Sequence, residues 1–520
     1  MTSDLKQPGA ILLISCYELG HQPLSIASPL ALLREAGYAP AVLDLAVQRL
    51  DPDLVARARF AAIAVPMHTA LRLGARVAQR IRALNPGCHL CLYGLYASLN
   101  AATLLARGAD SIIGGEYEEP LVRLVRSLDA GHRGDTGDAV RSEGALPEPL
   151  PGVPTAGDRF AGVRIAGVRT AGAAEPPWID RIRFAVPWRD PLPVLDRYAR
   201  LEEHGRSRAA GHVEASRGCL HHCRHCPIPP VYGGRFFVVP REVVLADIRN
   251  QAAAGATHVT FGDPDFLNGP RHSMALARAM HAELPGLTFD FTAKIEHLLR
   301  HRDLLPELRR LGCLFIVSAV ESLSDRVLAI LAKDHTRADV EEALRLTRAA
   351  GLALRPSFVP FTPWSGLEDY RALLDFVESR DLVDSLDPVQ LSIRLLLPPG
   401  SLLLDRPETR PFLGPLDPDR FTHLWTHPDP RMDALQLAVS ALVERAARNG
   451  EDPLLTFHRI NAAANAAEEE APSPLGSPTA ASERQNGARA ESARLPSAGV
   501  LAAMRRDKSR PPRLSEPWFC

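Results

Sequence analysis

Apolar residues along the first 128 positions fall into short runs separated by segments with helical periodicity. Each run is long enough for one buried strand, and each intervening segment is apolar at every third or fourth position, as in an amphipathic helix. The runs cover residues 11–15, 40–46, 60–66, 88–94 and 111–115, and the helical segments cover 28–37, 71–84, 101–108 and 118–128. This alternation predicts a doubly wound, flavodoxin-like α/β domain over residues 1–128.

A second alternating block follows over residues 191–405. Its expected strands are 212–216, 258–262, 288–294, 314–321, 354–360 and 389–397, with helical segments between them. Six strand–helix repeats predict a partial (β/α)6 barrel, and the chemistry of such a barrel is at the carboxyl ends of its strands.

The remaining segments differ in composition from these two blocks. Residues 129–190 are rich in Gly and Pro and are expected to form a linker, and residues 406–460, with a helical patch at 418–449, are expected to form a helical C-terminal region. Residues 461–520 hold few large apolar side chains until the final RLSEPWFC, which predicts a disordered tail.

Charge and cysteine content narrow the function classes. Sixty Lys and Arg residues against 61 Asp and Glu residues give a net charge of -1, which excludes a general basic surface for nucleic acid. Eight cysteines in 520 residues are too few for a disulfide scaffold, and no apolar run approaches the roughly 20 residues of a membrane span. We expect a cytoplasmic protein without a membrane anchor.

Three cysteines lie close together directly after the first expected barrel strand. Cys219, Cys223 and Cys226 form a CxxxCxxC pattern within SRGCLHHCRHCP. Soft thiolate ligands select an iron–sulfur cluster, Zn²⁺ or Cu⁺. A zinc knuckle completed by His221, His222 or His225 is the alternative. By contrast, Cys88 and Cys91 in CHLC would face opposite sides of a strand and are not expected to chelate.

The spacing and position of the triplet resemble the radical SAM family. The resemblance implies a [4Fe–4S] cluster whose fourth iron is left open for S-adenosylmethionine, which is cleaved to a 5′-deoxyadenosyl radical. It also implies an oxygen-sensitive enzyme and an electron donor such as flavodoxin or ferredoxin.

The same resemblance assigns S-adenosylmethionine contacts to residues along the barrel mouth. They are His225 before the third cysteine, Gly262, Asp263 and Asp265 after the second strand, Ser318 and Glu321 on the fourth strand, and Arg394 on the last strand. The alternatives are a strand-end turn capped by Asp, a helix N-cap around Glu321, and a solvated strand end at Arg394.

A doubly wound domain before such a barrel resembles the cobalamin-binding radical SAM proteins, and GGEYEE at 114–119 is similar to their strand-end signature. The implied crevice residues are Gly20, His21, Met67, His68, Thr69, Gly94, Tyr96, Gly114, Gly115 and Glu116. The DxHxxG loop that ligates cobalt in some cobalamin domains is absent, so cobalamin is an optional third cofactor.

Several motifs, including GHQPLSIASP, HVTFGDPDFLNGP and the terminal EPWFC, resemble the CUAEP/CCAEP-tail radical SAM (seleno)protein family. In that family the tail continues with Cys or selenocysteine and then Ala-Glu-Pro. We therefore expect Cys520 to be a catalytic redox residue, and the chain to be truncated at a selenocysteine codon after it.

These observations leave several functions open. The leading hypothesis is a radical SAM enzyme acting on an unidentified substrate, with cobalamin-dependent methyl transfer as the favoured subclass. The alternatives are a cobalamin-free radical rearrangement, a reduction, sulfur- or selenium-group chemistry, or a non-catalytic Fe–S protein for electron transfer or binding.

Overall fold

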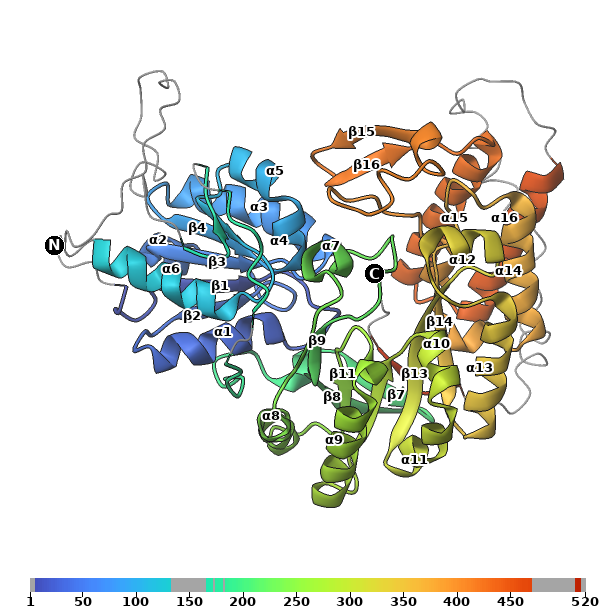
Figure 1. Ribbon diagram of the computed structural model, residues 1–520, viewed down its shortest axis with the longest axis horizontal. Helices are drawn as coiled ribbons and strands as arrows, with labels where there is room; N and C mark the ends of the chain where they lie inside the picture. The colour runs from blue at the N-terminus through green and yellow to red at the C-terminus, as the bar shows by residue number, and fades with distance from the viewer. Residues whose placement is uncertain (1–4, 132–164, 172–173, 181–182, 470–509, 516–520) are drawn as a thin grey trace.

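Two largely parallel sheets meet near the middle of the molecule in the computed structural model (Figure 1). The structure describes residues 5–131, 165–171, 174–180, 183–469 and 510–515. The N-terminal sheet and its helices lie on the left of Figure 1, and the second sheet, with its helices on the outside, lies on the right.

The N-terminal sheet has the strand order β2-β1-β3-β4-β5-β6. Its strands are β1 (Ile11–Ser15), β2 (Ala41–Asp44), β3 (Phe60–Ala64), β4 (His89–Tyr93), β5 (Ser111–Ile113) and β6 (Val168–Arg169). The first five run parallel, and β6 pairs antiparallel with β5. This order is the flavodoxin-like one, which confirms the predicted fold class of the domain.

Helices cover both faces of this sheet. They are α1 (Leu24–Glu35), α2 (Pro52–Arg57), α3 (His68–Leu84), α4 (Leu95–Leu99), α5 (Ala101–Ala106) and α6 (Glu118–Gly131). Helices α1 and α6 pack together on one face, and α2 to α5 lie on the other. Because both faces are covered, the strands are apolar throughout, and Cys91 and Cys88 lie in separate core clusters on the two faces, as the strand geometry predicted.

The second sheet is a curled half-barrel with the order β14-β13-β12-β11-β8-β7-β17. Its strands are β7 (Arg200–Glu203), β8 (Arg206–Val213), β11 (His258–Phe261), β12 (Thr288–Thr292), β13 (Cys313–Glu321), β14 (Ala353–Phe358) and β17 (Arg513–Leu514). The connecting helices are α8 (Arg241–Ala253), α9 (Pro270–Glu283), α10 (Ile295–Arg300), α11 (Leu305–Arg310), α12 (Asp325–Leu331), α13 (Arg337–Ala349) and α14 (Leu367–Ser379).

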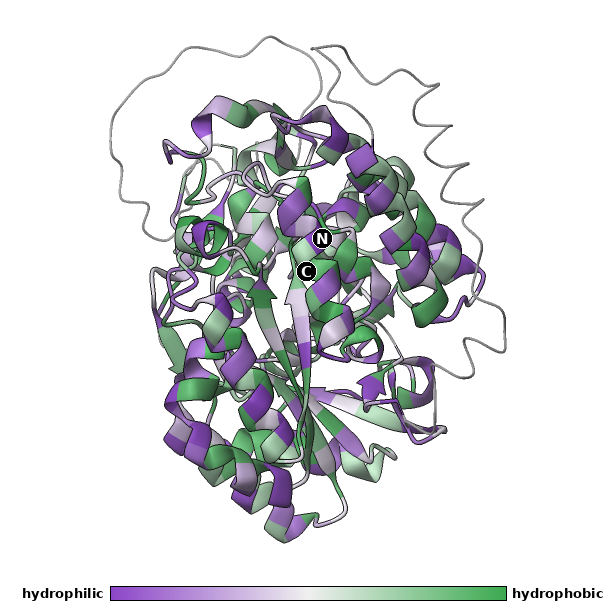
Figure 2. Cartoon of the chain, turned by 90° about the vertical axis from the view of Figure 1, so that its right-hand side faces the viewer, coloured by the Kyte–Doolittle hydropathy of each residue, from purple (hydrophilic) through white to green (hydrophobic). Residues whose placement is uncertain are grey.

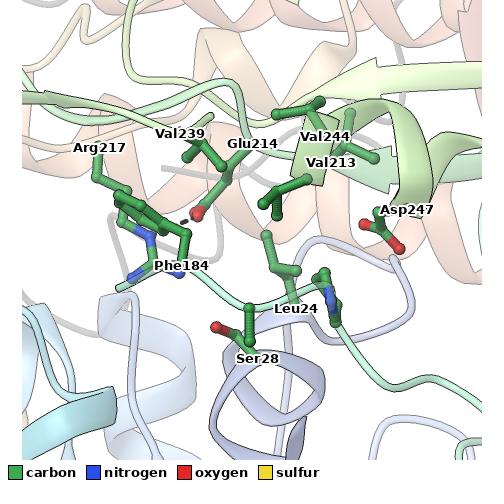
Figure 3. Close-up of a pocket in the computed structure, with 12 residues that line it drawn as sticks. Leu24, Ser28, Phe184, Val213, Glu214, Arg217, Val239, Val244 and Asp247 are labelled. Carbon is green, nitrogen blue, oxygen red and sulfur yellow. Dashed lines mark hydrogen bonds and ion pairs between the residues drawn. The ribbon is translucent and has the colours of Figure 1, made fainter. Parts of the chain in front are cut away.

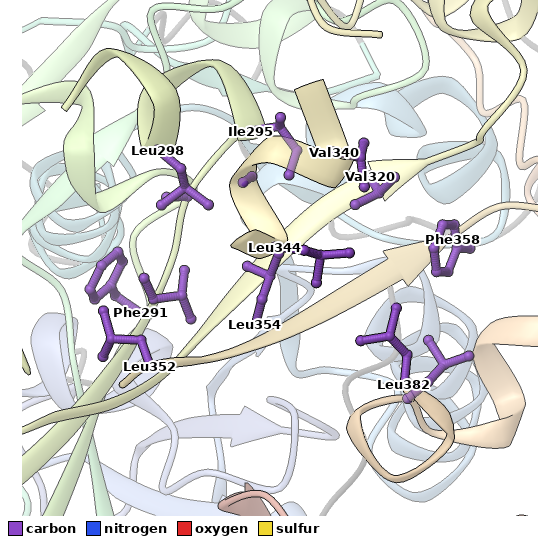
Figure 4. Close-up of a cluster of buried hydrophobic side chains, with 14 of the residues drawn as sticks. Phe291, Ile295, Leu298, Val320, Val340, Leu344, Leu352, Leu354, Phe358 and Leu382 are labelled. Carbon is purple, nitrogen blue, oxygen red and sulfur yellow. The ribbon is translucent and has the colours of Figure 1, made fainter. Parts of the chain in front are cut away.

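Side-chain alternation gives this sheet an apolar and a polar face. Phe291, Val320 and Leu354 point from β12, β13 and β14 toward Leu298 and Leu344 of the outer helices (Figure 4). Coloured by hydropathy, the outer helices carry many polar residues on their solvent side (Figure 2). The sheet therefore buries one face under helices.

The concave face carries polar side chains. His258 Nε2 lies 2.8 Å from Asp290 Oδ1, and Thr260 donates to the same oxygen at 2.7 Å. Arg355, on β14, pairs with Asp387 at 3.2 Å. Thr260 and Val317 remain partly exposed on this face. The inner surface thus combines buried polar pairs with a few partly exposed positions.

The sixth expected barrel strand, at 389–397, is reduced to one bridge. Pro388 opens a 3-10 turn over Pro388–Leu391, and only Arg394 bridges to Phe361. Phe361 donates to the carbonyl of Ile393 and accepts from the amide of Leu395. Proline lacks an amide donor, so the ladder cannot begin where the apolar run begins. The parallel half-barrel therefore has five long strands.

Two antiparallel pairings extend the half-barrel at its β8 edge. Strand β7 pairs antiparallel with β8 and with β17, so β17 runs in the direction of the barrel strands. Arg513 also forms an ion pair with Glu202 at 2.7 Å. The carboxyl end of β17 consequently points to the same edge as the barrel mouth.

The C-terminal region differs from the prediction at both ends. Residues 413–425 form a hairpin of β15 (Leu413–Asp417) and β16 (Thr422–Trp425), followed by α15 (Pro430–Arg448) and α16 (Pro453–Glu469). The helical prediction for 406–460 was therefore wrong for the hairpin, and the predicted disorder was wrong for 461–469. Ala463, Ala464 and Ala467 are small enough to pack in the core.

The expected linker also contains structure where it is described. Residues 129–131 complete α6, β6 extends the first sheet, and Trp178 bridges to Gly115. Cys520 and residues 132–164 lie outside the described residues. In the described part of the chain, we find no helix both long enough and apolar enough to span a membrane.

The β15–β16 hairpin connects the two domains. Phe421 is 2% exposed and belongs to a core cluster of the N-terminal domain. Asp419 pairs with Arg107 at 2.5 Å, and His68 Nε2 lies 2.7 Å from the Arg420 carbonyl. The hairpin thus holds the N-terminal domain against the C-terminal part of the barrel.

Replacing Phe421 with Ala should release this connection. The loss of a buried ring should destabilise the chain by about 3–5 kcal/mol in denaturant unfolding and increase hydrogen exchange in the hairpin. Leu424 lies on the same hairpin but is 38% exposed, so Leu424→Ala is the matched control and should change little. Equal effects of the two substitutions would contradict the anchoring role of Phe421.

Candidate functional site

The loop that carries the three cysteines begins in a small hairpin at the mouth of the half-barrel. Strand β9 (Ser216–Gly218) pairs antiparallel with β10 (Phe236–Val238), and α7 (Ile228–Tyr232) lies between them in sequence. Gly218 has φ +73°, and a Cβ there would overlap the carbonyl of Arg235. That carbonyl accepts from the amide of Cys219 at 3.1 Å, so the start of the loop is fixed by backbone contacts.

Two of the three cysteines of the loop are buried, and the third, Cys226, is half-buried. Cys219 is 9% exposed and Cys223 is 7% exposed, and the amide of Cys226 donates to the carbonyl of Cys223 at 3.2 Å. Burial raises the pKa of Cys226 to about 12 and also raises the pKa of Cys219. Three sulfur donors on one short loop are the ligand type that an iron–sulfur cluster takes, so the donor set fits such a group.

The nearby imidazoles have other partners, which disfavours the zinc alternative. His225 Nε2 lies 3.1 Å from Glu321 Oε1, and His221 Nδ1 lies 3.2 Å from Lys294 Nζ. The ring of His222 packs against Gly234, where a Cβ would meet it. The loop therefore offers three thiols while His221 and His225 contact other side chains, and the open coordination position that the resemblance implied stays a prediction.

A buried acid–base network supports the loop from the β13 side. Burial alone would raise the pKa of Glu321, but Lys333, at 3.3 Å, and then His225 lower it to about 2. Glu321 has φ +69°, and Ala332 and Asp334 on either side of Lys333 have φ +53° and +58°. Left-handed backbone at non-glycine residues is strained, and strain of this kind gathers at functional sites.

Sequence reasoning missed Lys333. Its side chain is buried, and its ammonium interacts electrostatically with Cys223 and Cys226 as well as with Glu321. The signal was present in LAKDHT, where four polar residues follow helix α12. Without the fold, that segment reads as an ordinary exposed helix end.

The residues after β11 bind mainly to the chain itself. Asp263 accepts from the amide of Ala215 at 2.9 Å and from the Ser216 hydroxyl, and burial raises its pKa to about 7. Asp265 accepts from the amides of Leu267 and Lys294. These contacts correspond to the alternative interpretation, a strand-end turn capped by Asp.

Gly262, the first residue after β11, has a steric role. A Cβ at Gly262 would overlap the imidazole of His212, which is buried on the neighbouring strand β8. Its role in binding S-adenosylmethionine stays a prediction, as do those of Asp263 and Asp265.

Two other predicted S-adenosylmethionine contacts lie away from the open face. Ser318 shares a side of β13 with Ile316 and Val320, which pack under the helices, and its hydroxyl has no hydrogen-bond partner in the described structure. Arg394 pairs with Asp433 at 2.6 Å and stacks on the Trp425 ring at 3.5 Å. Ser318 faces the layer of outer helices, and Arg394 faces Asp433 of α15 and Trp425 of the β15–β16 hairpin.

Two groups of side chains near the cluster loop have spacings that suit a cation. In the group His221, Glu296 and Asp334, the ammonium of Lys294 already lies 3.2–3.5 Å from each partner. In the group His221, Asp265 and His297, His221 would have to bind metal while its other nitrogen faces that ammonium. A metal-binding imidazole normally donates its second N–H to an acceptor, so Lys294 disfavours a second metal here.

The first strand-end loop of the N-terminal domain packs against the barrel. His21 is 4% exposed and stacks on His212 with ring centroids 4.6 Å apart. The carbonyl of Gly20 accepts from the amide of Ala199 at 2.8 Å. The structure thus brings His21 to the domain boundary, where its ring is covered by protein.

The loops after β3 and β4 lie beside the β15–β16 hairpin. His68 and Tyr96 form an edge contact at 5.9 Å, and Met67 and Thr69 keep some exposure. Gly94, with φ +108°, lies against the backbone of Val65. Among the predicted crevice residues, those after β3 are the most accessible.

The loop after β5 is covered by the linker. A Cβ at Gly114 would overlap Ser98, and one at Gly115 would overlap the carbonyl of Trp178. Glu116 is fully buried and accepts from Tyr232 at 2.9 Å and from Arg217 at 3.1 Å. Burial raises the pKa of Glu116 to about 7, against the opposing effect of Arg217.

These loops do not fit a cobalamin whose cobalt is ligated by the protein. His21 is covered by His212, and His68 Nε2 already contacts the Arg420 carbonyl. The prediction that the missing DxHxxG removes a protein ligand to cobalt stays a prediction.

Comparison with known proteins identifies the half-barrel. Residues 213–376 match the model of the Radical SAM superfamily, so the predicted radical SAM domain is confirmed. A tRNA-2-methylthio-N(6)-dimethylallyladenosine synthase of Dichelobacter nodosus is 24% identical over 205 residues, 36% of this chain and 43% of that protein. The chain spans less than half the length of the curated relatives it matches first.

Solved structures resemble a larger part of the chain. TsrM from Kitasatospora setae, a radical S-adenosylmethionine methyltransferase, has a TM-score of 0.60 and 18% identity over 82% of this chain and 88% of its own. OxsB, a cobalamin-dependent S-adenosylmethionine radical enzyme, has a TM-score of 0.62 and 14% identity over 87% of this chain and 72% of its own. These similarities confirm the fold class, a doubly wound domain joined to a radical SAM half-barrel.

The stacked His21–His212 pair predicts an acid-sensitive domain boundary. Burial lowers the pKa of His21 to about 4 and lowers that of His212 well below its usual value, and Arg189 adds to both shifts. Between pH 6.5 and 4 the unfolded chain takes up protons that the folded chain does not. The free energy of unfolding should therefore decrease as the pH is lowered. At pH 5.5 the decrease relative to neutral pH should be about 1 kcal/mol per imidazole.

The variant His21→Phe tests this origin because it keeps an aromatic ring in place and removes one titration. As the pH falls from 7 to 5, the free energy of unfolding should decrease less in this variant than in the unchanged chain. Urea denaturation at each pH measures the difference. A difference between the two proteins that stays constant over this range would contradict the assignment.

Proposed function

We propose that this protein is a radical SAM enzyme that cleaves S-adenosylmethionine reductively to methionine and a 5′-deoxyadenosyl radical, which abstracts hydrogen from a substrate. The single observation that supports it most directly is the CxxxCxxC loop at the mouth of the half-barrel that matches the Radical SAM superfamily. Its Cys219 and Cys223 are buried, its Cys226 is half-buried, and its His221 and His225 contact other side chains. When bound, a [4Fe–4S] cluster on these cysteines supplies the electron for the cleavage.

The chain's own residues have separable roles in this proposal. Cys219, Cys223 and Cys226 hold the cluster, and the Lys333 ammonium offsets part of the negative charge of the thiolates. His225 is oriented by Glu321 beside the third cysteine. The partly exposed concave face supplies space for S-adenosylmethionine and substrate.

Anaerobic reconstitution tests the proposal. The full chain loaded with iron and sulfide should bind four irons per chain and, with dithionite and S-adenosylmethionine, form 5′-deoxyadenosine. The triple Cys219→Ala, Cys223→Ala and Cys226→Ala variant should lose both properties. Cys88→Ala is the control, because Cys88 is a buried thiol in the core of the N-terminal domain and does not belong to the cluster loop.

Two outcomes would contradict the assignment. Four irons retained by the triple variant would place the cluster on other cysteines. A fully loaded chain that forms no 5′-deoxyadenosine would favour the alternative of an Fe–S electron-transfer or binding protein.

Cobalamin-dependent methyl transfer is the favoured subclass of this proposal. The supporting observation is that the fold similarity to the cobalamin-dependent enzyme OxsB covers 87% of this chain, which is more than the half-barrel alone. Equilibrium dialysis against hydroxocobalamin should show about one corrin retained per full chain, with an absorbance spectrum unaffected by His68→Ala. No retention by the folded chain would favour cobalamin-free rearrangement, reduction, or sulfur- or selenium-group chemistry.

The assignment to the CUAEP/CCAEP-tail family and the redox role of Cys520 belong to the proposal as well. The supporting observation is that β17, which ends at Leu514, runs parallel to the barrel strands. The chain leaves this strand at the edge that carries the cluster loop.

The proposed partners and location follow from the same chemistry. A one-electron donor such as flavodoxin or ferredoxin must reach the cluster, and the substrate is unassigned. Every cysteine that the structure describes is a free thiol, which supports a reducing, cytoplasmic setting for an oxygen-labile cluster.

A further inference from the structure

A buried arginine directly before the cluster loop contacts carboxylates of both domains. Arg217 lies in β9, two residues before Cys219, and its side chain is 9% exposed. Its Nη1 lies 3.1 Å from Glu116 and 2.6 Å from Glu118 of the N-terminal domain, and its Nε lies 2.7 Å from Glu214 of the barrel.

The same N-terminal carboxylate also holds the other end of the loop. Tyr232, the last residue of α7, donates its hydroxyl to Glu116 Oε1 at 2.9 Å, while Arg217 contacts Glu116 Oε2. Arg217 precedes Cys219 and Tyr232 follows Cys226, so the two oxygens of one carboxylate bind both flanks of the cluster loop.

The N-terminal carboxylates of this contact are shielded from bulk water. Glu116 and Glu118 are 0% and 1% exposed, and Ser28 of α1 donates to Glu118 at 2.7 Å. The rings of Tyr117 and Phe184 lie 5.5 and 5.4 Å from the guanidinium. A cavity of about 20 Å³ beside Arg217, Glu214 and Ser28 has room for about one water molecule (Figure 3). Buried charges have no solvent to replace a lost partner, so the geometry is strongly constrained.

We propose that Glu116, supported by Glu118, is a positioning residue through which the N-terminal domain fixes the conformation of the cluster loop. It acts on Arg217 at one flank of the loop and on Tyr232 at the other, and contacts neither the cluster nor the substrate. The inference rests on the proposed function, because it assigns to the first domain a part in orienting the site for S-adenosylmethionine.

The variant Glu116→Gln tests this role. An amide loses the negative charge that binds Arg217 and keeps only one acceptor oxygen. Its NH2 can only donate to Tyr232, whose hydroxyl would then have to turn from donor to acceptor, so the hold on both flanks of the loop is weakened. We expect four irons per chain after reconstitution. The rate of 5′-deoxyadenosine formation should be at least tenfold lower at saturating S-adenosylmethionine, and the change that S-adenosylmethionine causes in the EPR spectrum of the reduced cluster should be weakened.

A control and a milder variant separate positioning from general destabilisation. Glu119 pairs with Arg123 on the exposed side of α6, so Glu119→Gln should stay within twofold of the unchanged chain. Tyr232→Phe removes one hydroxyl only and should lower the rate three- to tenfold, with no further loss when it is combined with Glu116→Gln. If Glu116→Gln fails to fold, Tyr232→Phe alone decides the question.

Three results would overturn the inference. They are an unchanged rate and EPR response in Tyr232→Phe, an equal loss in Glu119→Gln, and fully additive losses in the double variant. An unchanged chain that is fully loaded but forms no 5′-deoxyadenosine would instead contradict the proposed function, so the two failures are distinguishable.

Discussion

Parallel strand pairing is the constraint on which the arrangement of the site depends. In the two large sheets, the described strands other than β6 and β7 run in one direction, so the loops after them meet at one edge, whatever their separation in sequence. The cysteine loop after β8, the turn after β11 and the end of β13 are brought together in this way. Lys333 joins them only because α12 returns the chain to the same edge.

The buried charges at the domain boundary are the second constraint. Three carboxylates surround the guanidinium of Arg217, and two of them come from the N-terminal domain. Removing one partner of a buried ion pair typically costs about 3–5 kcal/mol, because the other charge is left without compensation. The two domains therefore have one favoured contact at this place, and the β15–β16 hairpin reinforces it on another side through Phe421.

The N-terminal domain illustrates how a binding fold can use its strand-end loops for contacts within the chain. Of the four loops expected to form a cofactor crevice, the first packs under His212 and the last is covered by Trp178 and bound to Arg217 and Tyr232. Glycines in these loops are required where backbone segments approach closely, as at Gly115. Residues of the first and last loops thus form contacts with the rest of the chain. The most accessible of the expected crevice residues are those after β3.

Sequence periodicity predicted the wrong structure in two segments, one that begins after a proline and one rich in alanine. The run at 389–397 alternates as a strand does, yet Pro388 lacks an amide donor and opens a turn. The alanine-rich segment after residue 460 resembled a disordered tail because alanine has little apolar surface, although small side chains suit the close packing of α16 against α14 and α15. Neither outcome is visible without knowing what lies opposite the segment.

The sequence by itself determined the two α/β blocks, the order of their elements and the CxxxCxxC triplet, because helix and strand periods and ligand spacing are local properties. It could not determine that His21 would stack on His212, that Arg394 would pair with Asp433, or that Lys333 would be buried beside the cysteines. It also left Glu116 as a crevice residue. Only the tertiary structure decided that one carboxylate would bind both flanks of the cluster loop, because that contact joins residues about a hundred positions apart whose burial depends on how the two sheets meet.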